Sequence, residues 1–147
     1  MSLKRMVMEL GMGTDIQGGD YTKAATRAVH NALRQNSLSV YEAFGVSRDE
    51  MKVTIIIGAQ QPDKVDKAAV AAMLPYGSAT VEVEFGGMDT PKEGAASDNK
   101  DNATLQPTIM ANAALIVYLD LPEGATYDCT PPSTAPITPK PEVGAGA

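Results

Sequence analysis

The sequence predicts an α/β (α+β) fold, a sheet with two helices packed on one of its faces. Strand-like apolar segments at residues 4–10, 51–57, 79–85 and 108–121 are combined with two helical segments whose apolar stripes consist mostly of alanine. An order of strand, helix, strand, helix, strand, long loop and strand is typical of a helix layer on a sheet. The 147 residues suit one such domain, which we place at residues 1–121, with an extended tail at 122–147.

The first strand and the segment after it organise the rest of the chain. Residues 4–10 alternate with a period of two, so that one face carries Met6, Met8 and Leu10 and the other carries Arg5, Val7 and Glu9. Four glycines follow, namely Gly11, Gly13, Gly18 and Gly19. A helix is then predicted over residues 21–35, with either Asp20 or Thr22 as its cap. The helix has a stripe of small residues, Ala25, Ala28, Val29, Ala32 and Leu33, which predicts close packing on a sheet.

The middle of the chain supplies a central strand and a second helix. β-branched residues dominate residues 51–57, where Val53, Ile55 and Ile57 face one way, and this favours a strand buried inside the sheet. A short helical turn at residues 40–45 comes before it. A second helix is expected after it, opened by Pro62 with either Asp63 or Asp66 and stopped by Pro75 and Gly77.

The last two strands flank a long polar segment. In residues 79–85 the apolar positions alternate with Thr80, Glu82 and Glu84, so one face of this strand is polar. Residues 108–121 are rich in Ile, Val and Leu, which favours a final strand over a helix. The intervening residues 86–107 predict either a lid or a disordered loop. The six prolines of residues 122–147 predict an extended tail.

Charge and hydropathy exclude several kinds of partner. Twelve Lys and Arg face eighteen Asp and Glu, a net charge of −6, and no basic run is present, so nucleic acid is not an expected partner. No apolar run approaches the roughly 20 residues of a membrane span, and no signal-peptide core is present, so we expect no membrane association and a cytoplasmic location. The lone His30 and the lone Cys129 have no metal-ligand spacing, so neither a metal nor a cofactor is expected.

One face of the predicted sheet needs a partner. If both helices cover the same face, the opposite face carries Val7, Thr54, Ile56 and the pair Glu82 and Glu84. A half-apolar open face of this kind usually marks an interaction surface. We therefore expect a homo-oligomer.

The glycine-rich turn is the candidate ligand site. Glycines leave backbone amides unshielded, and the N-terminus of the following helix adds partial positive charge, which together favour a small anion such as a carboxylate or a phosphate. A tight strand-to-helix turn without a ligand explains the same glycines. The candidate ligand-binding residues, some contributed by a neighbouring subunit, are Gly11, Gly13, Asp15, Gln17, Asp20, Thr22, Lys52, Glu82 and Glu84.

Three blocks resemble the YjgF/RidA imine deaminases, which share a trimeric fold with the Bacillus-type chorismate mutase. The blocks are residues 26–33, residues 51–57 and residues 74–84 with their Thr-Val-Glu-Val strand. The resemblance implies a trimer, or a multiple of it, with ligands in clefts between subunits. The arginine with which those enzymes hold a substrate carboxylate corresponds to Ser78 here, so the resemblance does not carry over their activity.

Two further resemblances involve the glycine-rich turn. In the ring-opening amidohydrolases, cyanuric acid hydrolase and barbiturase, a similar turn precedes Asn-Asp-Phe-Thr-Arg, where this chain has Gly19-Asp-Tyr-Thr-Lys23. This resemblance implies a hydrolase-like site. The serine and lysine with which those enzymes work are absent here, however: the serine corresponds to the region of Gly58 and Ala59, and the lysine to Met12. Residues 4–120 also resemble a small bacterial and fungal family of conserved hypothetical proteins first catalogued from Listeria, with the same Gly-Met-Gly opening.

Two functions follow as expectations from the sequence. The first is an oligomeric small-molecule-binding protein with its site at the glycine-rich turn, near a subunit interface. The second is a non-catalytic oligomeric module that interacts with other proteins through the open sheet face and the tail.

Overall fold

A computed structural model describes residues 1–91 and 106–126 of the chain. The elements, in order, are β1 (Ser2–Asp15), α1 (Tyr21–Leu33), α2 (Val40–Ala43), η1 (Arg48–Glu50), β2 (Lys52–Ala59), η2 (Pro62–Lys64), α3 (Lys67–Ala71), β3 (Ser78–Phe85), β4 (Met88–Thr90) and β5 (Thr108–Leu121).

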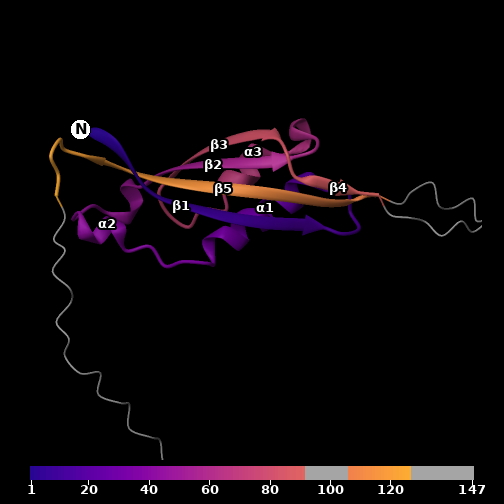
Figure 1. Ribbon diagram of the computed structural model, residues 1–147, viewed down its shortest axis with the longest axis horizontal. Helices are drawn as coiled ribbons and strands as arrows, with labels where there is room; N and C mark the ends of the chain where they lie inside the picture. The colour runs from indigo at the N-terminus through magenta and orange to yellow at the C-terminus, as the bar shows by residue number, and fades with distance from the viewer. Residues whose placement is uncertain (92–105, 127–147) are drawn as a thin grey trace, which may run out of the picture.

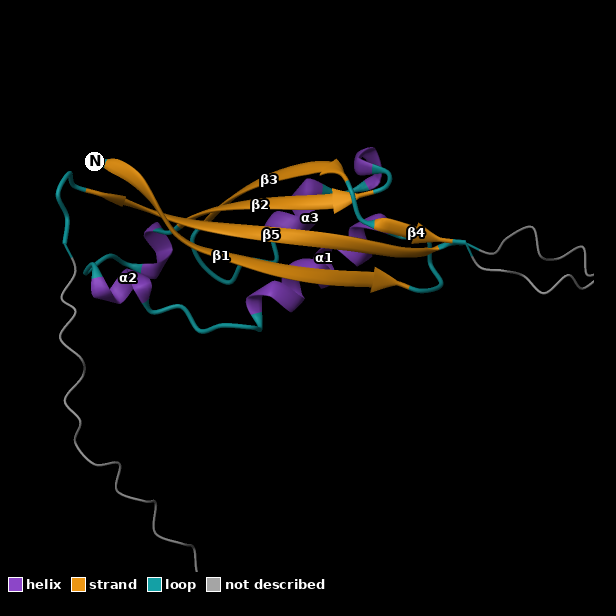
Figure 2. Ribbon diagram, in the orientation of Figure 1, coloured by secondary structure: helices purple, strands orange, loops and turns teal. Residues whose placement is uncertain are grey.

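The strands form one mixed sheet (Figure 1), in the order β1-β5-β2-β3, and the short β4 pairs with the start of β5. β5 is antiparallel to both of its long neighbours, whereas β2 and β3 run parallel. Helices α1 and α3 both lie behind this sheet in Figure 2, and α1 packs mainly on β1 and β5. The predicted arrangement of two helices on one sheet face is therefore confirmed.

The core lies between these helices and the sheet. Val53, Ile55 and Ile57 of β2 are buried there, as the alternation of residues 51–57 predicts. β5 contributes every second residue, namely Ile109, Ala111, Ala113, Leu115, Val117, Leu119 and Leu121. From α1 come Ala24, Ala25, Ala28, Val29 and Ala32, so the helix side of the interface is made almost wholly of small residues. Small side chains allow a helix to approach a sheet closely.

β1 differs from its prediction in length and in orientation. It continues to Asp15 instead of ending at residue 10, so Gly11 and Gly13 belong to the strand. The register shifts between Arg5 and Val7, and Val7 then pairs with the buried Val117 on the helix side. The placement of Val7 on the open face was therefore wrong, and the bulge is the physical reason.

The second helix also differs from its prediction. Of the two predicted openings, Asp66 is confirmed as the N-cap of α3, whereas residues 62–64 form the separate one-turn η2, and the five-residue α3 ends at Ala71, before Pro75. Between them Val65 is extended, with ψ at 122°, and the side chain of Asp66 accepts hydrogen bonds from the nitrogens of Ala68 and Ala69. An Asp that caps in this way begins a new helix rather than continuing an old one.

The other predicted elements are present close to their expected bounds. α1 starts where predicted and ends two residues early, α2 occupies the predicted turn, and β3 and β5 agree to within one residue. β4 lies in the segment expected to be a lid or a disordered loop. Residues 92–105 of that segment and most of the predicted tail lie outside the described residues. Within the described part, no helix has the length and apolarity to cross a membrane.

Between Leu10 and Thr14, the outer edge of β1 is covered by side chains of α1 and of Gln35, which lies two residues after its end. The contacts are Arg27 Nη1 to the carbonyl oxygen of Thr14 (2.6 Å), the nitrogen of Met12 to Asn31 Oδ1 (3.1 Å), and Gln35 Nε2 to the carbonyl oxygen of Leu10 (2.9 Å). The helix residues are spaced by four and the strand residues by two, so one helix face follows the edge. These side chains take the hydrogen bonds that a neighbouring strand would otherwise make, which protects the edge from pairing with another chain.

Candidate functional site

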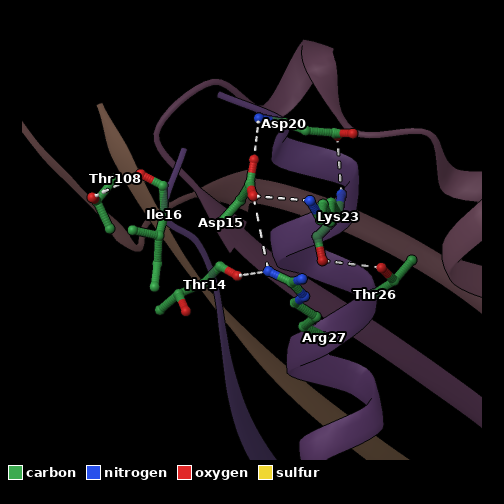
Figure 3. Close-up of polar contacts among 8 residues, drawn as sticks. All are labelled: Thr14, Asp15, Ile16, Asp20, Lys23, Thr26, Arg27 and Thr108. Carbon is green, nitrogen blue, oxygen red and sulfur yellow. Dashed lines mark hydrogen bonds and ion pairs between the residues drawn. The ribbon is translucent and has the colours of Figure 1, made fainter. Parts of the chain in front are cut away.

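The turn between β1 and α1 is organised by Asp15, which is only 2% exposed. Figure 3 shows its carboxylate at the centre of the polar contacts. Oδ2 accepts a hydrogen bond from the nitrogen of Asp20 at 2.9 Å, and Oδ1 lies 3.3 Å from Lys23 Nζ and 3.8 Å from Arg27 Nη1. Asp15 therefore holds the turn against the first two turns of α1.

These contacts set the ionisation of Asp15. The hydrogen bond from the Asp20 nitrogen lowers the pKa of this carboxyl below its ordinary value of 3.8, and Lys23 and Arg27 add to the effect. Burial acts in the opposite direction but is outweighed. Asp15 is thus a carboxylate at neutral pH, and both of its oxygens are engaged by groups of the same chain.

Gly11 and Gly13 serve the packing of α1 rather than a ligand cradle. A Cβ on Gly13 would lie 2.2 Å from the carbonyl oxygen of Ala24 and 2.2 Å from the nitrogen of Ala28. A Cβ on Gly11 would lie 2.2 Å from the carbonyl oxygen of Ala28. No side chain fits between strand and helix at these two positions, so of the two interpretations of the glycines the structural one accounts for this pair.

The N-terminus of α1 is already occupied by carboxylates of the chain. Asp20 is the N-cap, and its Oδ1 accepts a hydrogen bond from the nitrogen of Lys23 at 3.0 Å. The nitrogen of Asp20 itself is bound by Asp15. Gly19, with φ at 63°, closes the turn, and the side chain of Gln106 packs against it. An anion at this turn would meet two acidic side chains on amides that it needs, so the geometry does not favour the anionic ligand that we expected.

The remaining predicted site residues are spread along the molecule. Thr22 Oγ1 joins α1 to the segment after η2, donating to the carbonyl oxygen of Lys64 at 3.3 Å and accepting from the nitrogen of Asp66 at 2.9 Å. Gln17 is exposed. Lys52 lies far from the turn. It pairs with Tyr118 of β5, whereas Asp15 pairs with Ile109, and these two positions of β5 are roughly 30 Å apart.

Glu82 and Glu84 lie on the open side of β3, opposite Ile56 and Gly58. Both are exposed, as expected for the polar face of a strand. They do not meet the glycine-rich turn within one chain, so the structure brings together only Asp15 and Asp20 of the predicted charged set.

A second polar contact lies close to the turn and was not predicted. The hydroxyl of Tyr21, which is 3% exposed, donates a hydrogen bond to Asp89 Oδ2. Burial and the neighbouring carboxylate both raise the pKa of Tyr21, so it stays a neutral donor. Asp89 Oδ1 is buried without a hydrogen-bond partner among the described residues. The signal for this contact was hidden because Tyr21 and Asp89 are 68 residues apart.

The sheet face away from α1 and α3 carries exposed apolar side chains. We call it the open face. It comprises Arg5, Met8, Leu10 and Met12 of β1, Asn112, Ala114, Ile116 and Tyr118 of β5, Lys52, Thr54 and Ile56 of β2, and Thr80, Glu82 and Glu84 of β3. Met8, Leu10 and Met12 are 47%, 58% and 56% exposed. A hollow of about 260 Å³ lies on this face, bordered by Leu10, Ile56, Asn112 and Glu84 among others.

A buried carboxylate lies on the opposite side of the sheet. Glu9 follows Val7 on the helix side of β1, is only 4% exposed, and its Oε1 has no hydrogen-bond partner among the described residues. It borders a small cavity, and within the described part of the chain the other residues that line this cavity are uncharged. The sequence marked Glu9 only as a polar position on one face of the first strand. Its burial depends on where α1 and the segment after it pack.

Possible metal ligands do not gather in the described part of the chain. There, no group of three or more His, Cys, Asp or Glu side chains is arranged to hold a metal ion. His30 lies on α1, 3.2 Å from Arg34 Nη1. Cys129 lies outside the described residues.

Comparisons with known proteins identify relatives of this chain. The model of a family described as "Conserved hypothetical protein (Lin0512_fam)" matches residues 5–117. The crystal structure of an FtsZ-like protein of unknown function from Nostoc punctiforme is 35% identical, with a TM-score of 0.71, and the match covers 82% of this chain and 99% of that one. No curated protein matches. The predicted kinship with the family first catalogued from Listeria is confirmed, whereas the resemblances to the YjgF/RidA proteins and the amidohydrolases stay predictions.

Proposed function

This chain belongs to the Lin0512 family of conserved hypothetical proteins, and we propose that it functions as a self-associating interaction protein. In this proposal the open face of one copy packs against the open face of a second copy. The observation that carries the proposal is the stripe Met8, Leu10 and Met12, three consecutive outward side chains of one strand that are each about half exposed.

The apolar character of the open face continues beyond this stripe. Ile116 of β5 lies beside Met8, and Ile56 of β2 pairs with Ala114 in the next row. Two sheets that stack face to face bury such rows in a layer about 10 Å thick. Each Å² of apolar surface removed from water contributes about 25 cal/mol, so a contact centred on these rows gains most from the hydrophobic effect.

The alternative route to self-association, edge to edge, is less favoured. Arg27, Asn31 and Gln35 already bind three backbone groups of β1, between Leu10 and Thr14. A second chain that paired with this edge would first have to displace these three side chains. The face therefore offers the better contact.

The charges of the open face favour one orientation of the second copy. Lys52 lies at the start of β2, and Glu84 lies beside the end of the same strand, paired with Gly58. A two-fold axis in the interface, perpendicular to the strands, brings Lys52 of each copy to the Glu84 end of the other. Lys52 also lies 3.6 Å from Asp120 Oδ2, an exposed pair of the kind that contributes little. A two-fold axis parallel to the strands would instead place Lys52 over the Lys52 end of the second copy.

The test places a charge in the centre of the contact. Because the substitution enters a two-fold contact twice, Leu10→Asp is expected to weaken self-association by about 100-fold or more. Sedimentation velocity at about 50 μM should show wild type as an oligomer and Leu10→Asp as a monomer with an unchanged circular dichroism spectrum. The mass also separates a dimer from the trimer-based assembly that the YjgF resemblance implies.

The matched control adds the same charge elsewhere. Asn36 is exposed just after α1 and away from the open face, so Asn36→Asp should sediment as wild type does. The proposal fails if Leu10→Asp keeps the wild-type mass, or if wild type itself is monomeric.

The sequence also predicts a small-molecule-binding function, and the cavity beside Glu9 supports it better than the glycine-rich turn does. This cavity lies on the helix side of the sheet and does not depend on self-association.

A further inference from the structure

Glu9 is an acidic residue on the helix side of β1 whose buried Oε1 has no hydrogen-bond partner among the described residues. Its neighbours along the helix side of β1 are Val7 and Gly11, and across the sheet it pairs with Leu115. At 4% exposure its carboxylate has lost almost all contact with water, and Oε1 receives no hydrogen bond from any described residue. A buried carboxyl oxygen without a hydrogen-bond partner is costly, and a cationic donor would satisfy it.

The volume and lining of the cavity beside Glu9 limit which cationic group fits there. The cavity has a volume of about 30 Å³, enough for about two waters or a group of similar size. Among the described residues, Glu9 is the only charged one that borders it, and the other walls are formed by Leu33, Leu38, Met51, Val53, Leu74, Pro75, Tyr76, Leu115 and Val117. A ligand that fills this space needs one cationic donor and a small apolar body.

The neighbouring cation of the chain is engaged elsewhere. The Arg48 guanidinium lies 5.2 Å from the ring centroid of Tyr76, in a cation–π contact, and Arg48 does not border the cavity. On the open side of the cavity Pro75 is exposed, and Leu38 and Tyr76 are half-buried. The cavity therefore has an apolar mouth through which a longer chain can extend.

We propose that this cavity binds a primary ammonium group carried on a short alkyl chain, with Glu9 as its anchor. An ammonium group supplies both the positive charge and the hydrogen-bond donors that Oε1 lacks. The alkyl carbons match the Leu and Val walls. A carboxylate or a phosphate would be repelled by Glu9, and a neutral hydrocarbon would leave its oxygen unpaired.

The test uses ethylammonium chloride as the probe, with sodium chloride and ethanol as controls. Sodium chloride supplies the ionic strength without the ligand, and ethanol supplies the shape without the charge. A ligand of three heavy atoms binds no more tightly than about the millimolar range, so the probe is added to about 50 mM. The melting temperature of wild type is expected to rise by about 2 °C or more with ethylammonium and not with either control.

Glu9→Gln is the decisive variant, because it keeps the shape of the side chain and removes the charge. We expect its melting temperature not to respond to ethylammonium. Should Glu9→Gln fail to fold, Glu9→Met removes the polar group altogether and serves for the same comparison. Equal responses of wild type and variant would overturn the proposal, as would no response of wild type.

A crystal grown with ethylammonium gives an independent result. Its nitrogen within about 3 Å of Glu9 Oε1 supports the proposal. If such a crystal shows only water at Glu9 Oε1, the proposal is contradicted.

Discussion

Replacing Gly13 by alanine is expected to lower the free energy of unfolding by about 3 kcal/mol, the upper part of the usual range for overpacking. The added Cβ would lie 2.2 Å from two backbone atoms of α1, the oxygen of Ala24 and the nitrogen of Ala28. Backbone atoms cannot turn away as a flexible side chain can, so α1 must move off the sheet. Since α1 covers β1 and β5, the movement opens the core, and the melting temperature should fall by about 10 °C.

The control for this prediction is Gly58→Ala. Gly58 also lies in a strand, but a Cβ there would point to the open face and meet first Asn112 Oδ1, at 3.2 Å, which is the end of a side chain. Urea unfolding followed by circular dichroism should place Gly58→Ala within about 1 kcal/mol of wild type. If Gly13→Ala were as stable as Gly58→Ala, the close approach of α1 to β1 would be incorrect.

The second large effect is expected at Asp15. Asp15→Ala removes a buried carboxylate and leaves the nitrogen of Asp20 without its acceptor, so we expect a loss of about 2 kcal/mol at pH 7. Lys23 and Arg27 are about half exposed and regain water, which keeps the loss below that of a fully buried ion pair. Asp63→Asn, at an exposed carboxylate of η2, should change stability by less than about 0.5 kcal/mol.

The same residue predicts a dependence on pH. Folding lowers the pKa of Asp15, so the unfolded state takes up its proton more readily than the folded state. The stability that Asp15 contributes is complete above its ordinary pKa of 3.8 and is lost as the pH falls through the lower pKa of the folded state. Urea titrations from neutral to acid pH should show a steeper loss for wild type than for Asp15→Asn. Parallel curves would mean that Asp15 is not held as the structure shows.

Local pattern was enough to predict most strands and the start of α1. The alternation of residues 79–85 and the β-branched residues of β2 mark strands whatever surrounds them. The sequence left Asp20 and Thr22 as alternative caps, and Asp20 is the one that accepts from the nitrogen of Lys23. The glycines were harder, because a glycine needed for a turn and one needed beneath a helix look alike in sequence. Gly13 belongs to the second kind only because α1 folds back on β1.

Which side chains of β1 face the helices also depends on contacts that the sequence does not display. One extra residue at the bulge between Arg5 and Val7 moves Val7 to the helix side and leaves Met8 and Leu10 uncovered. The same shift buries Glu9. For the candidate site, Asp15 and Asp20 come together because they share one turn, whereas Lys52, Glu82 and Glu84 are held apart by the length of the strands.

Exchange of charges between Lys52 and Glu84 tests the central claim most directly. Lys52→Glu and Glu84→Lys should each weaken self-association, because each places like charges together across the two-fold contact. When the two variants are mixed, every contact in the mixed pair again joins opposite charges. Sedimentation velocity should therefore show association restored in the mixture and absent or weakened in each variant alone. Equal association in all samples, or a mixture as weak as its components, would contradict the open-face contact.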